Sequence, residues 1–187
     1  QVVLPSNATD AKGLLKTAIR SDDPVLFLEH KGLYRQVYAK GPEGGADDLI
    51  PLGKARVARE GTDLTIITYG ALVQKSLLAA ERLSREEGVS VEVIDVRSII
   101  PLDTETLFQS VRKTNRVLIA HEDVVFMGFG AEIAAQIANE CFDSLDAPVK
   151  RVGMKWVAAV PHAPALEEVV LPQVEEVVSA ARQVLSY

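Results

Sequence analysis

Residues 63–96 read DLTIITYGALVQKSLLAAERLSREEGVSVEVIDV. The runs Leu64 to Tyr69 and Val91 to Val96 are rich in β-branched residues, which suits strands that are covered on both faces. Between them, residues 71–85 carry apolar side chains at helical spacing and predict an amphipathic helix. A strand, a helix and a second strand form the unit from which parallel α/β sheets are built, so this stretch decides the fold.

The alternation of strand and helix continues to the C-terminus. It predicts a helix capped by Asp103 and Thr104, followed by a strand at 117–120, a helix at 129–142, a strand at 149–152 and a helix at 174–185. We therefore expect an α/β fold, a three-layer α/β/α sandwich around a mostly parallel sheet of about five strands. Residues 54–59 alternate apolar and polar side chains, as a half-exposed strand does. We expect this strand to pair with residues 64–69 through a turn at 60–63 and to run antiparallel at the sheet edge.

The first 40 residues predict a separate and incomplete unit. They suggest a strand end at Val2 to Leu4, a helix capped by Thr9 or Asp10 that runs to about Arg20, and a short buried strand at Val25 to Leu28. So few residues cannot enclose a core, so we expect them to complete a domain whose main body lies upstream of Gln1. The acidic, glycine-rich stretch GPEGGADD at 41–48 indicates a linker, which divides the chain into 1–40, 41–52 and 53–187.

Charge and hydropathy disfavour two classes of partner. The chain has 26 acidic and 20 basic residues, a net charge of −6, and no Lys/Arg cluster on a predicted face, so a nucleic-acid partner is not expected. No window approaches the run of roughly 20 apolar residues that crosses a bilayer, so a membrane is not expected either. The single Cys141 fits a reducing compartment, and we expect it to be a buried structural thiol.

The glycines at 128 and 130 open a predicted helix after a strand, where a dinucleotide-binding turn would lie. Ile133 occupies the third-glycine position of that motif, and the connection after Ala120 is too long for a tight phosphate-binding turn. Close packing of this helix against another backbone, as at a dimer interface, is therefore the favoured interpretation.

Two histidines, His121 and His162, are candidates for a functional site because of their positions in the predicted fold. His121 and Glu122 directly follow a predicted strand, at the carboxyl edge where open α/β sheets usually place their sites. The favoured interpretation is that Glu122 caps a loop or pairs across an interface, with His121 a hydrogen-bonded polar neighbour. His162 lies in a proline-framed loop and either orients a partner or only follows the loop. No nucleophile elbow, metal spacing or phosphate-binding loop occurs, so the residues do not predict a complete active site.

The helix end near residue 20 is a candidate cation site. The last turn of a helix leaves carbonyl oxygens unpaired at the negative end of the macrodipole. A tight turn through Ala18, Ser21 and Asp23 would present several oxygens to a monovalent cation. From these residues alone, a helix end hydrated by water is the favoured alternative.

A series of short motifs extends along the whole chain. They are DAKGLL (10–15), AIR (18–20), DPV (23–25), EHK (29–31), IPLGKA (50–55), GTD (61–63), DVRSIIPLD (95–103), KT (113–114), HE (121–122), LDAP (145–148) and PH (161–162). Together they resemble the beta subunits of thiamine-diphosphate-dependent 2-oxo acid dehydrogenases of the branched-chain and pyruvate types. The resemblance implies that residues 1–40 close the pyrimidine-binding domain and that 53–187 form a transketolase C-terminal domain.

The same resemblance implies a division of labour. In this family the glutamate that pairs with the aminopyrimidine and the histidine of acyl transfer lie upstream of this chain, and the diphosphate and magnesium belong to the alpha subunit. We therefore expect no catalytic and no cofactor-binding residue here. The parent enzyme would decarboxylate a branched-chain 2-oxo acid oxidatively and pass the acyl group to lipoyl on the acyltransferase, while this chain, inactive alone, serves assembly and docking. A pyruvate substrate and a stand-alone dimerising protein-binding module are the alternatives.

Two sets of residues carry over from the family. Backbone carbonyls of Ala18, Ser21 and Asp23 match a turn that holds a structural potassium ion. The implied partners are the alpha subunit, a second beta subunit and the peripheral subunit-binding domain of the acyltransferase. Asp146 and the terminal carboxylate of Tyr187 match the docking position for that last partner. The implied compartment is the bacterial cytoplasm, or the mitochondrial matrix in a eukaryote.

Overall fold

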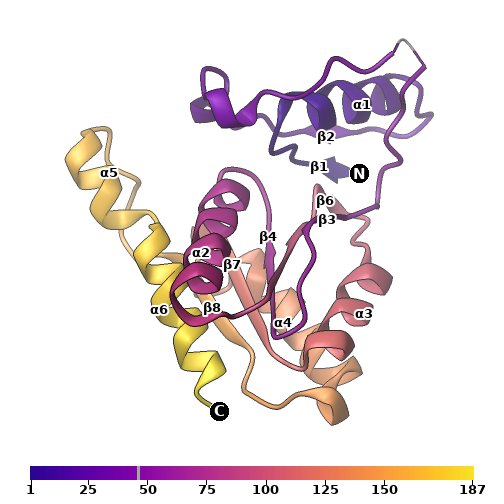
Figure 1. Cartoon of the computed structure of the whole chain (residues 1–187). Helices are drawn as coiled ribbons and strands as arrows, with labels where there is room; N and C mark the ends of the chain where they lie inside the picture. The colour runs from indigo at the N-terminus through magenta and orange to yellow at the C-terminus, as the bar shows by residue number, and fades with distance from the viewer. Residues whose placement is uncertain (46) are drawn as a thin grey trace.

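The computed structural model of the chain describes residues 1–45 and 47–187. Its main body is a five-stranded sheet in the order β3-β5-β4-β7-β8 (Figure 1). The strands are β3 (Arg56–Arg59), β4 (Leu64–Thr68), β5 (Val91–Asp95), β7 (Val117–Val124) and β8 (Lys150–Met154). The pairs β5–β4, β4–β7 and β7–β8 are parallel, and β3 runs antiparallel to β5 at one edge. The predicted sheet, mostly parallel with one antiparallel edge strand, is confirmed.

Helices cover both faces of this sheet. The helices α2 (Leu72–Glu87) and α6 (Val174–Leu185) lie on one face, and α3 (Thr104–Thr114) and α4 (Phe129–Glu140) lie on the other (Figure 1). Side chains of β4 alternate between the two cores, because Leu64 and Ile66 pack toward α2 and α6 while Ile67 packs toward α3 and α4. Cys141 is buried in the second core, as predicted. The three-layer sandwich is therefore the observed architecture.

The predicted pairing of the edge strand with β4 is wrong. β3 pairs with β5, in the register Arg56 to Asp95, and β5 separates it from β4. The backbone at Gly61 crosses the start of β5 so closely that a Cβ there would lie 2.2 Å from the backbone nitrogen of Glu92. Every residue of β4 is buried, so β4 takes a central place between two parallel neighbours. The half-exposed β3 is left for the edge.

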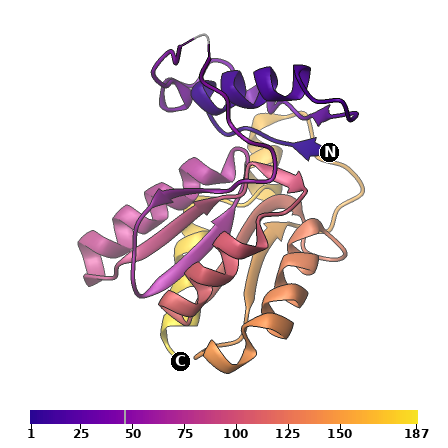
Figure 2. The same ribbon diagram turned by 90° about the vertical axis from the view of Figure 1, so that its right-hand side faces the viewer.

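The N-terminal residues form a smaller layer that caps one end of the sheet (Figures 1 and 2). Its elements are β1 (Val2–Val3), α1 (Ala8–Ile19), β2 (Leu26–Phe27) and the 3₁₀ turns η1 (Lys31–Leu33) and η2 (Val37–Ala39). β1 lies between β2, which is parallel to it, and β6 (Ser98–Ile100), which is antiparallel. Because β6 follows directly on β5, this small sheet ties the N-terminal layer to the main body.

Two local predictions in this layer are corrected. The N-cap of α1 is Asn7, whose side chain accepts a hydrogen bond from the backbone N–H of Asp10 at 2.9 Å, and neither Thr9 nor Asp10 has that role. Asp10 is instead turned inward to meet arginines. The strand β2 is not buried, since Leu26 is 64% exposed at the edge of its sheet.

The remaining elements follow the sheet toward the C-terminus. η3 (Phe142–Ser144) precedes β8, and a short helix, α5 (Pro164–Val170), follows the proline-framed loop. Pro164 suits the first turn of a helix because its missing N–H would have no partner there. No helix in the part of the chain that the structure describes is long and apolar enough to cross a membrane.

Candidate functional site

The carboxyl ends of β4 and β7 place two aromatic side chains together. The two strands are parallel neighbours, with Thr68 opposite Ala120, so Tyr69 and His121 follow at the same level of the sheet. Their rings are stacked, with centroids 6.2 Å apart and an interplanar angle of 5°. Phe129 of α4 closes the group with its ring edge toward Tyr69. The residues thus form a small aromatic cluster at the edge where α/β sheets usually bind ligands.

His121 is not the hydrogen-bonded neighbour that was predicted. Its side chain is fully buried, and neither ring nitrogen has a hydrogen-bond partner among the described residues. A Cβ at Gly130 would lie 2.2 Å from His121 Nε2, so α4 approaches the ring as closely as a helix can. Burial lowers the pKa of His121, Asp123 opposes that shift and Arg151 adds to it. The imidazole is therefore neutral at physiological pH and serves as packing.

Glu122, the next residue, points the other way and meets the N-terminal layer. Its Oε2 lies 2.8 Å from Nε2 of His30. The Glu122 carboxylate raises the pKa of His30 through this hydrogen bond, and burial opposes the shift. In place of a loop cap, the structure gives Glu122 a partner in the same chain, 92 positions away on the other layer.

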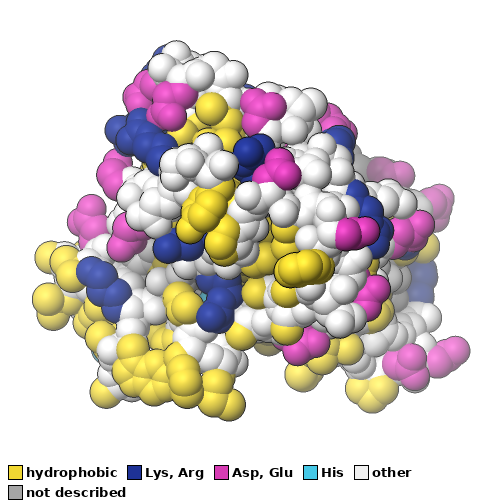
Figure 3. All heavy atoms as spheres, turned by 90° about the horizontal axis from the view of Figure 1, so that it is seen from below, with side chains coloured by type: hydrophobic (Ala, Val, Ile, Leu, Met, Phe, Trp, Pro, Cys, Tyr) yellow, Lys and Arg dark blue, Asp and Glu magenta, His cyan; other side chains and the backbone are white. Residues whose placement is uncertain are grey.

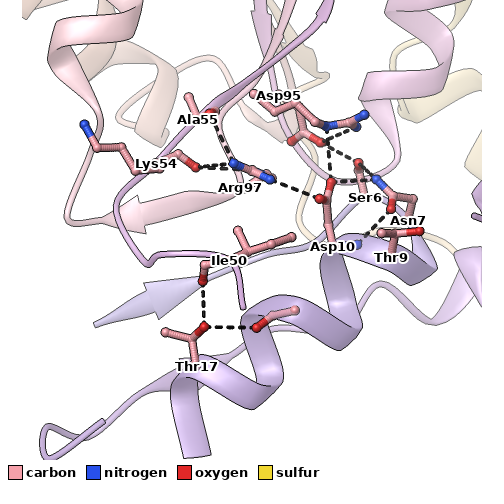
Figure 4. Close-up of polar contacts among 12 residues, drawn as sticks. Ser6, Asn7, Thr9, Asp10, Thr17, Ile50, Lys54, Ala55, Asp95 and Arg97 are labelled. Atoms are coloured by element: carbon pink, nitrogen blue, oxygen red, sulfur yellow. Dashed lines mark hydrogen bonds and ion pairs between the residues drawn. The ribbon is translucent and has the colours of Figure 1, made fainter. Parts of the chain in front are cut away.

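A buried cluster of charges forms a second joint between the layers (Figure 4). Arg97 Nη1 donates to Asp10 Oδ1 at 3.0 Å, and its other nitrogens donate to the backbone carbonyls of Lys54 and Ala55. Arg56 lies between two carboxylates, with Nε 3.2 Å from Asp10 Oδ2 and Nη2 3.1 Å from Asp95 Oδ2.

Ser6 completes this cluster from the loop before α1. Its hydroxyl donates to Asp95 Oδ2 at 2.5 Å. Asp95 is fully buried at the end of β5, and burial raises its pKa against the opposing effects of Ser6 and Arg56. Arg97 has the rare positive φ of 55°, which its hydrogen bonds hold in place. The polar residues at the carboxyl edge are therefore used to fix one layer on the other.

Sequence reasoning did not identify this charge cluster. Two signals pointed to it: Asp95 ends a predicted covered strand, and Arg97 follows two residues later. A buried carboxylate near an arginine indicates an ion pair, but which residue of the distant N-terminal layer joins it depends on the tertiary fold.

A cavity of about 330 Å³ lies inside the N-terminal layer. Side chains of α1 form one wall and the segment from Phe27 to Lys40 forms the other. Its lining is mostly apolar, with polar contributions from Asn7, Glu29, His30, Tyr34, Gln36 and Lys40. The carboxylate of Glu29 accepts a hydrogen bond from the hydroxyl of Tyr34.

The described residues do not fit the magnesium of a thiamine diphosphate site. No three His, Cys, Asp or Glu side chains within residues 1–45 and 47–187 are grouped as a metal ion requires. The cavity in the N-terminal layer offers one carboxylate, Glu29, and that group already accepts from Tyr34.

The turn after α1 lies at the surface and keeps oxygens free. The carbonyl of Ala18 accepts from the N–H of Ser21 at 3.2 Å, and the Ser21 hydroxyl accepts from the N–H of Asp23. Within the described residues, the carbonyl oxygens of Ser21 and Asp23 accept no hydrogen bond. The carbonyl oxygens of Ser21 and Asp23 are therefore available to a cation, while that of Ala18 already accepts a hydrogen bond.

The predicted docking residues lie at the opposite end of the molecule. Asp146 follows η3, is half exposed, and pairs with Arg116 through atoms 3.4 Å apart. Tyr187 is 72% exposed and shares a hollow with Pro148, two residues beyond Asp146. Figure 2 shows the C-terminus beside the turn that contains η3, and Figure 3 shows acidic, basic and hydrophobic side chains interspersed over this end. Tyr187 thus lines one hollow with a residue two positions from Asp146.

The other motifs have local roles in the structure. Gly128 caps α4 and packs against strand β7, where an added Cβ would lie 2.1 Å from the carbonyl oxygen of Val124. The close packing predicted for this helix is therefore used inside the chain. His162 is exposed in the loop before α5.

The fold and the capped sheet edge define a three-layer α/β domain with an N-terminal layer. The family model described as "Transketolase, C-terminal domain" matches residues 53–177, which is more than half of the chain. The chain belongs to the transketolase C-terminal domain family.

The chain is also similar over its whole length to beta subunits of 2-oxo acid dehydrogenases, which confirms the resemblance seen in the motifs. It is 43% identical to 2-oxoisovalerate dehydrogenase subunit beta of Bacillus subtilis, of which it covers 56%. It is 46% identical to the pyruvate dehydrogenase E1 component subunit beta of the same bacterium, again covering 56%. The mitochondrial pyruvate dehydrogenase beta subunit of Saccharomyces cerevisiae is 44% identical and covered to 51%. The chain thus spans about half the length of the curated relatives it matches.

A solved structure agrees with this assignment. The chain superposes on a split gene transketolase in an inactive beta4 tetramer with a TM-score of 0.80 and 30% identity, covering 100% of the chain and 58% of that structure. The transketolase of Leishmania mexicana, at 22% identity and a TM-score of 0.62, shares the fold.

Proposed function

We propose that the chain is part of the dehydrogenase-component beta subunit of a 2-oxo acid dehydrogenase complex. In that complex it serves subunit assembly and docking to the acyltransferase core, and it does not turn over substrate alone. The single observation that carries this proposal is 43–46% identity along the whole chain to beta subunits of the branched-chain and pyruvate types. Residues 1–40 would then close the pyrimidine-binding domain, 41–52 would link, and 53–187 would be the transketolase C-terminal domain.

The arrangement of the carboxyl edge supports a role in assembly. In an open α/β sheet, substrate and cofactor bind at the carboxyl ends of the strands. Here Ser6, Asp10 and His30 of the N-terminal layer bond to residues at those ends. The edge is thus occupied by the chain itself.

The proposed cofactors belong to the intact heterotetramer. Thiamine diphosphate would supply the electron sink for decarboxylation, with magnesium on its diphosphate, and both would be held by parts other than this chain. The alpha subunit and a second beta subunit are the proposed assembly partners. Names of bacterial and mitochondrial relatives agree with a cytoplasmic or a matrix location.

The proposed docking surface combines Asp146 with the terminal carboxylate of Tyr187. Its partner would be the basic peripheral subunit-binding domain of the acyltransferase. Arg116 already pairs with Asp146, so an incoming basic residue must share or displace that partner. Charge pairs at an exposed rim chiefly speed association and fix orientation.

The substrate of the parent enzyme is proposed to be a branched-chain 2-oxo acid, with pyruvate as the alternative. Both kinds of relative match the chain at similar identity. Reconstitution with the alpha subunit and the full-length beta subunit, assayed on both acids, decides between them. A higher kcat/KM on pyruvate would reverse our choice.

Calorimetric titration of thiamine diphosphate into the 187-residue chain tests the proposed division of labour. We expect no saturable heat in the presence of magnesium, because the groups that hold the cofactor lie elsewhere. Sub-micromolar binding would show that the chain carries its own cofactor site. A stand-alone binding module is distinguished by the gene: an upstream pyrimidine-binding domain in the same reading frame excludes it.

A further inference from the structure

The segment between β2 and η2 is a strap that covers the cavity of the N-terminal layer. We define the strap as residues 28–40. Ala39 is its one fully buried residue, and its regular structure is limited to two 3₁₀ turns. Together with Phe27 it forms one wall of the 330 Å³ cavity, whose other wall is made by the loop before α1 and by α1. A segment with so few buried side chains depends on its remaining contacts to stay in place.

Both ends of the strap are anchored within the N-terminal layer. Its first end continues β2, where Leu28 donates its N–H to the carbonyl of Val3 at 2.8 Å. Beyond its last end, the carbonyl of Pro42 accepts from the hydroxyl of Thr9 at 2.9 Å. The middle of the strap has neither kind of support.

The middle is joined to the sheet domain by His30. The contact between His30 Nε2 and Glu122 Oε2, 2.8 Å long, is the single side-chain hydrogen bond or ion pair that connects the strap to residues 53–187 in the described chain. Glu122 is fixed by its place on β7, directly after the buried His121. The strap is thus held to the rigid sheet through one titratable pair.

We propose that the His30–Glu122 pair is a proton-dependent latch that closes the strap over the cavity. With His30 protonated, the pair is a charge-assisted hydrogen bond. With His30 neutral, the Glu122 carboxylate is the one charged group of the pair, so the hydrogen bond loses the attraction between opposite charges and is weaker. The latch is therefore closed at acidic pH and loosens at alkaline pH.

Other charged groups lie near His30, on α5 and on the same cavity wall. Glu167 of α5 adds attraction for the protonated ring. Glu29 shares the cavity wall and accepts from Tyr34, while Lys40 is the basic group of the same wall. The pKa of His30 is raised above 6.5, mainly by Glu122. Stabilisation by the pair is therefore fully present below about pH 6.5 and is lost as the pH rises through the raised pKa.

Hydrogen exchange of the 187-residue chain tests the latch. Backbone amides of the strap are compared at about pH 5.5 and about pH 8.5 after division by the intrinsic exchange rate, with β4 amides as the internal reference. We expect their protection to fall about two- to fivefold over this range, the size set by one partly exposed ion pair. His30→Gln and Glu122→Gln should abolish the pH dependence, whereas His162→Gln, which removes an exposed histidine elsewhere, should keep it.

Two results would overturn the proposal. One is strap protection that does not change with pH in the wild type, or that changes equally in the wild type and in His30→Gln. The other comes from NMR titration of the wild-type chain, which needs no folded variant: a His30 pKa at or below about 6.5 would remove the latch. A His30 pKa above that value, which falls in Glu122→Gln, supports it.

Discussion

At the residue scale, His121 illustrates how a side chain with catalytic chemistry is used for packing. It lies at the sheet edge where a general base would be expected, yet it is fully buried and stacked on Tyr69. A buried imidazole without hydrogen bonds is costly to protonate. We therefore expect the buried His121 ring to make the folded chain less stable at acidic pH.

The acid sensitivity is testable through the linkage of protonation to unfolding. Burial lowers the pKa of His121, so the unfolded chain binds this proton first as the pH falls below about 6.5. Stability is then lost until the pH passes the lowered pKa. We expect His121→Leu, which cannot be protonated, to lose less stability between about pH 7.5 and about pH 5 in urea denaturation than the wild type does. His162→Gln should match the wild type, and equal losses in all three would contradict the assignment.

The contact between Gly130 and His121 gives a second prediction at this scale. An added methyl at position 130 would lie 2.2 Å from His121 Nε2 and must displace the ring or the helix. We expect Gly130→Ala to cost about 1–3 kcal/mol of unfolding free energy. In a His121→Ala background the same change should cost far less, because the ring is gone. Equal costs in both backgrounds would mean that another contact is responsible.

At the element scale, the arginine cluster decides how α1 sits on the sheet. Arg97, in the connection between β5 and β6, is joined to α1 through Asp10 and also holds the segment before β3 through the carbonyls of Lys54 and Ala55. Asp10 and Arg97 are both almost fully buried, so removing one leaves the other as an uncompensated buried charge. The joint between the layers therefore depends on complete pairing.

We expect Arg97→Ala to destabilise the chain by about 3–5 kcal/mol, measured by denaturant unfolding. Arg97→Gly should cost about 1 kcal/mol less than Arg97→Ala, because the backbone φ of 55° suits glycine. Arg85→Ala, on an exposed arginine of α2, should change stability by no more than about 0.5 kcal/mol. If Arg97→Ala lowered the unfolding free energy no more than Arg85→Ala does, Arg97 would not be the residue that joins the layers.

The helix end of α1 carries a prediction for the proposed potassium ion. In the intact heterotetramer we expect potassium to raise the melting temperature above that in equal sodium. Ser21→Ala should leave this effect unchanged, because the proposed ligand is the backbone carbonyl. Ser21→Pro should remove it, since proline deletes the N–H that bonds to Ala18 and disfavours the helical backbone at Arg20. Loss of the effect in Ser21→Ala would exclude a backbone ligand.

At the scale of the whole molecule, the proposed assembly and docking regions lie at different ends. The N-terminal layer covers the carboxyl edge of the sheet, while Asp146 and Tyr187 lie at the far end, beside the C-terminus (Figure 1). A partner that docks at the far end leaves the capped edge untouched. The proposal therefore places assembly and docking on separate surfaces.

We expect Asp146→Lys to weaken binding of the peripheral subunit-binding domain about tenfold at low salt, and the difference to shrink as salt is added. Asp143→Lys is the matched control, because Asp143 is an exposed acid of η3 three positions away. It should weaken binding much less. Equal effects of the two variants would indicate a general influence of charge in place of a specific docking residue. Surface plasmon resonance with the immobilised domain measures both.

The sequence by itself determined the architecture of the main body. Apolar runs such as Leu64 to Thr68 can be buried only inside a covered sheet, and the helix of residues 174–185 was predicted with its observed bounds. The periodicity of apolar residues is a local property of the sequence, so it can be recognised without the tertiary structure. The family motifs, likewise, are local words in a fixed order.

The tertiary structure alone decided what lies beside what. Strand β3 pairs with β5 and not with its neighbour in sequence, Asn7 caps α1 because Asp10 turns inward to Arg97, and His30 meets Glu122. The β3–β5 pairing, the Asp10–Arg97 pair and the His30–Glu122 pair each join residues far apart in the chain, and their partners are selected by burial and charge once the layers have packed. A local sequence pattern does not determine such partners. The capped sheet edge and the contacts that hold the N-terminal layer on it are therefore seen only in the folded chain.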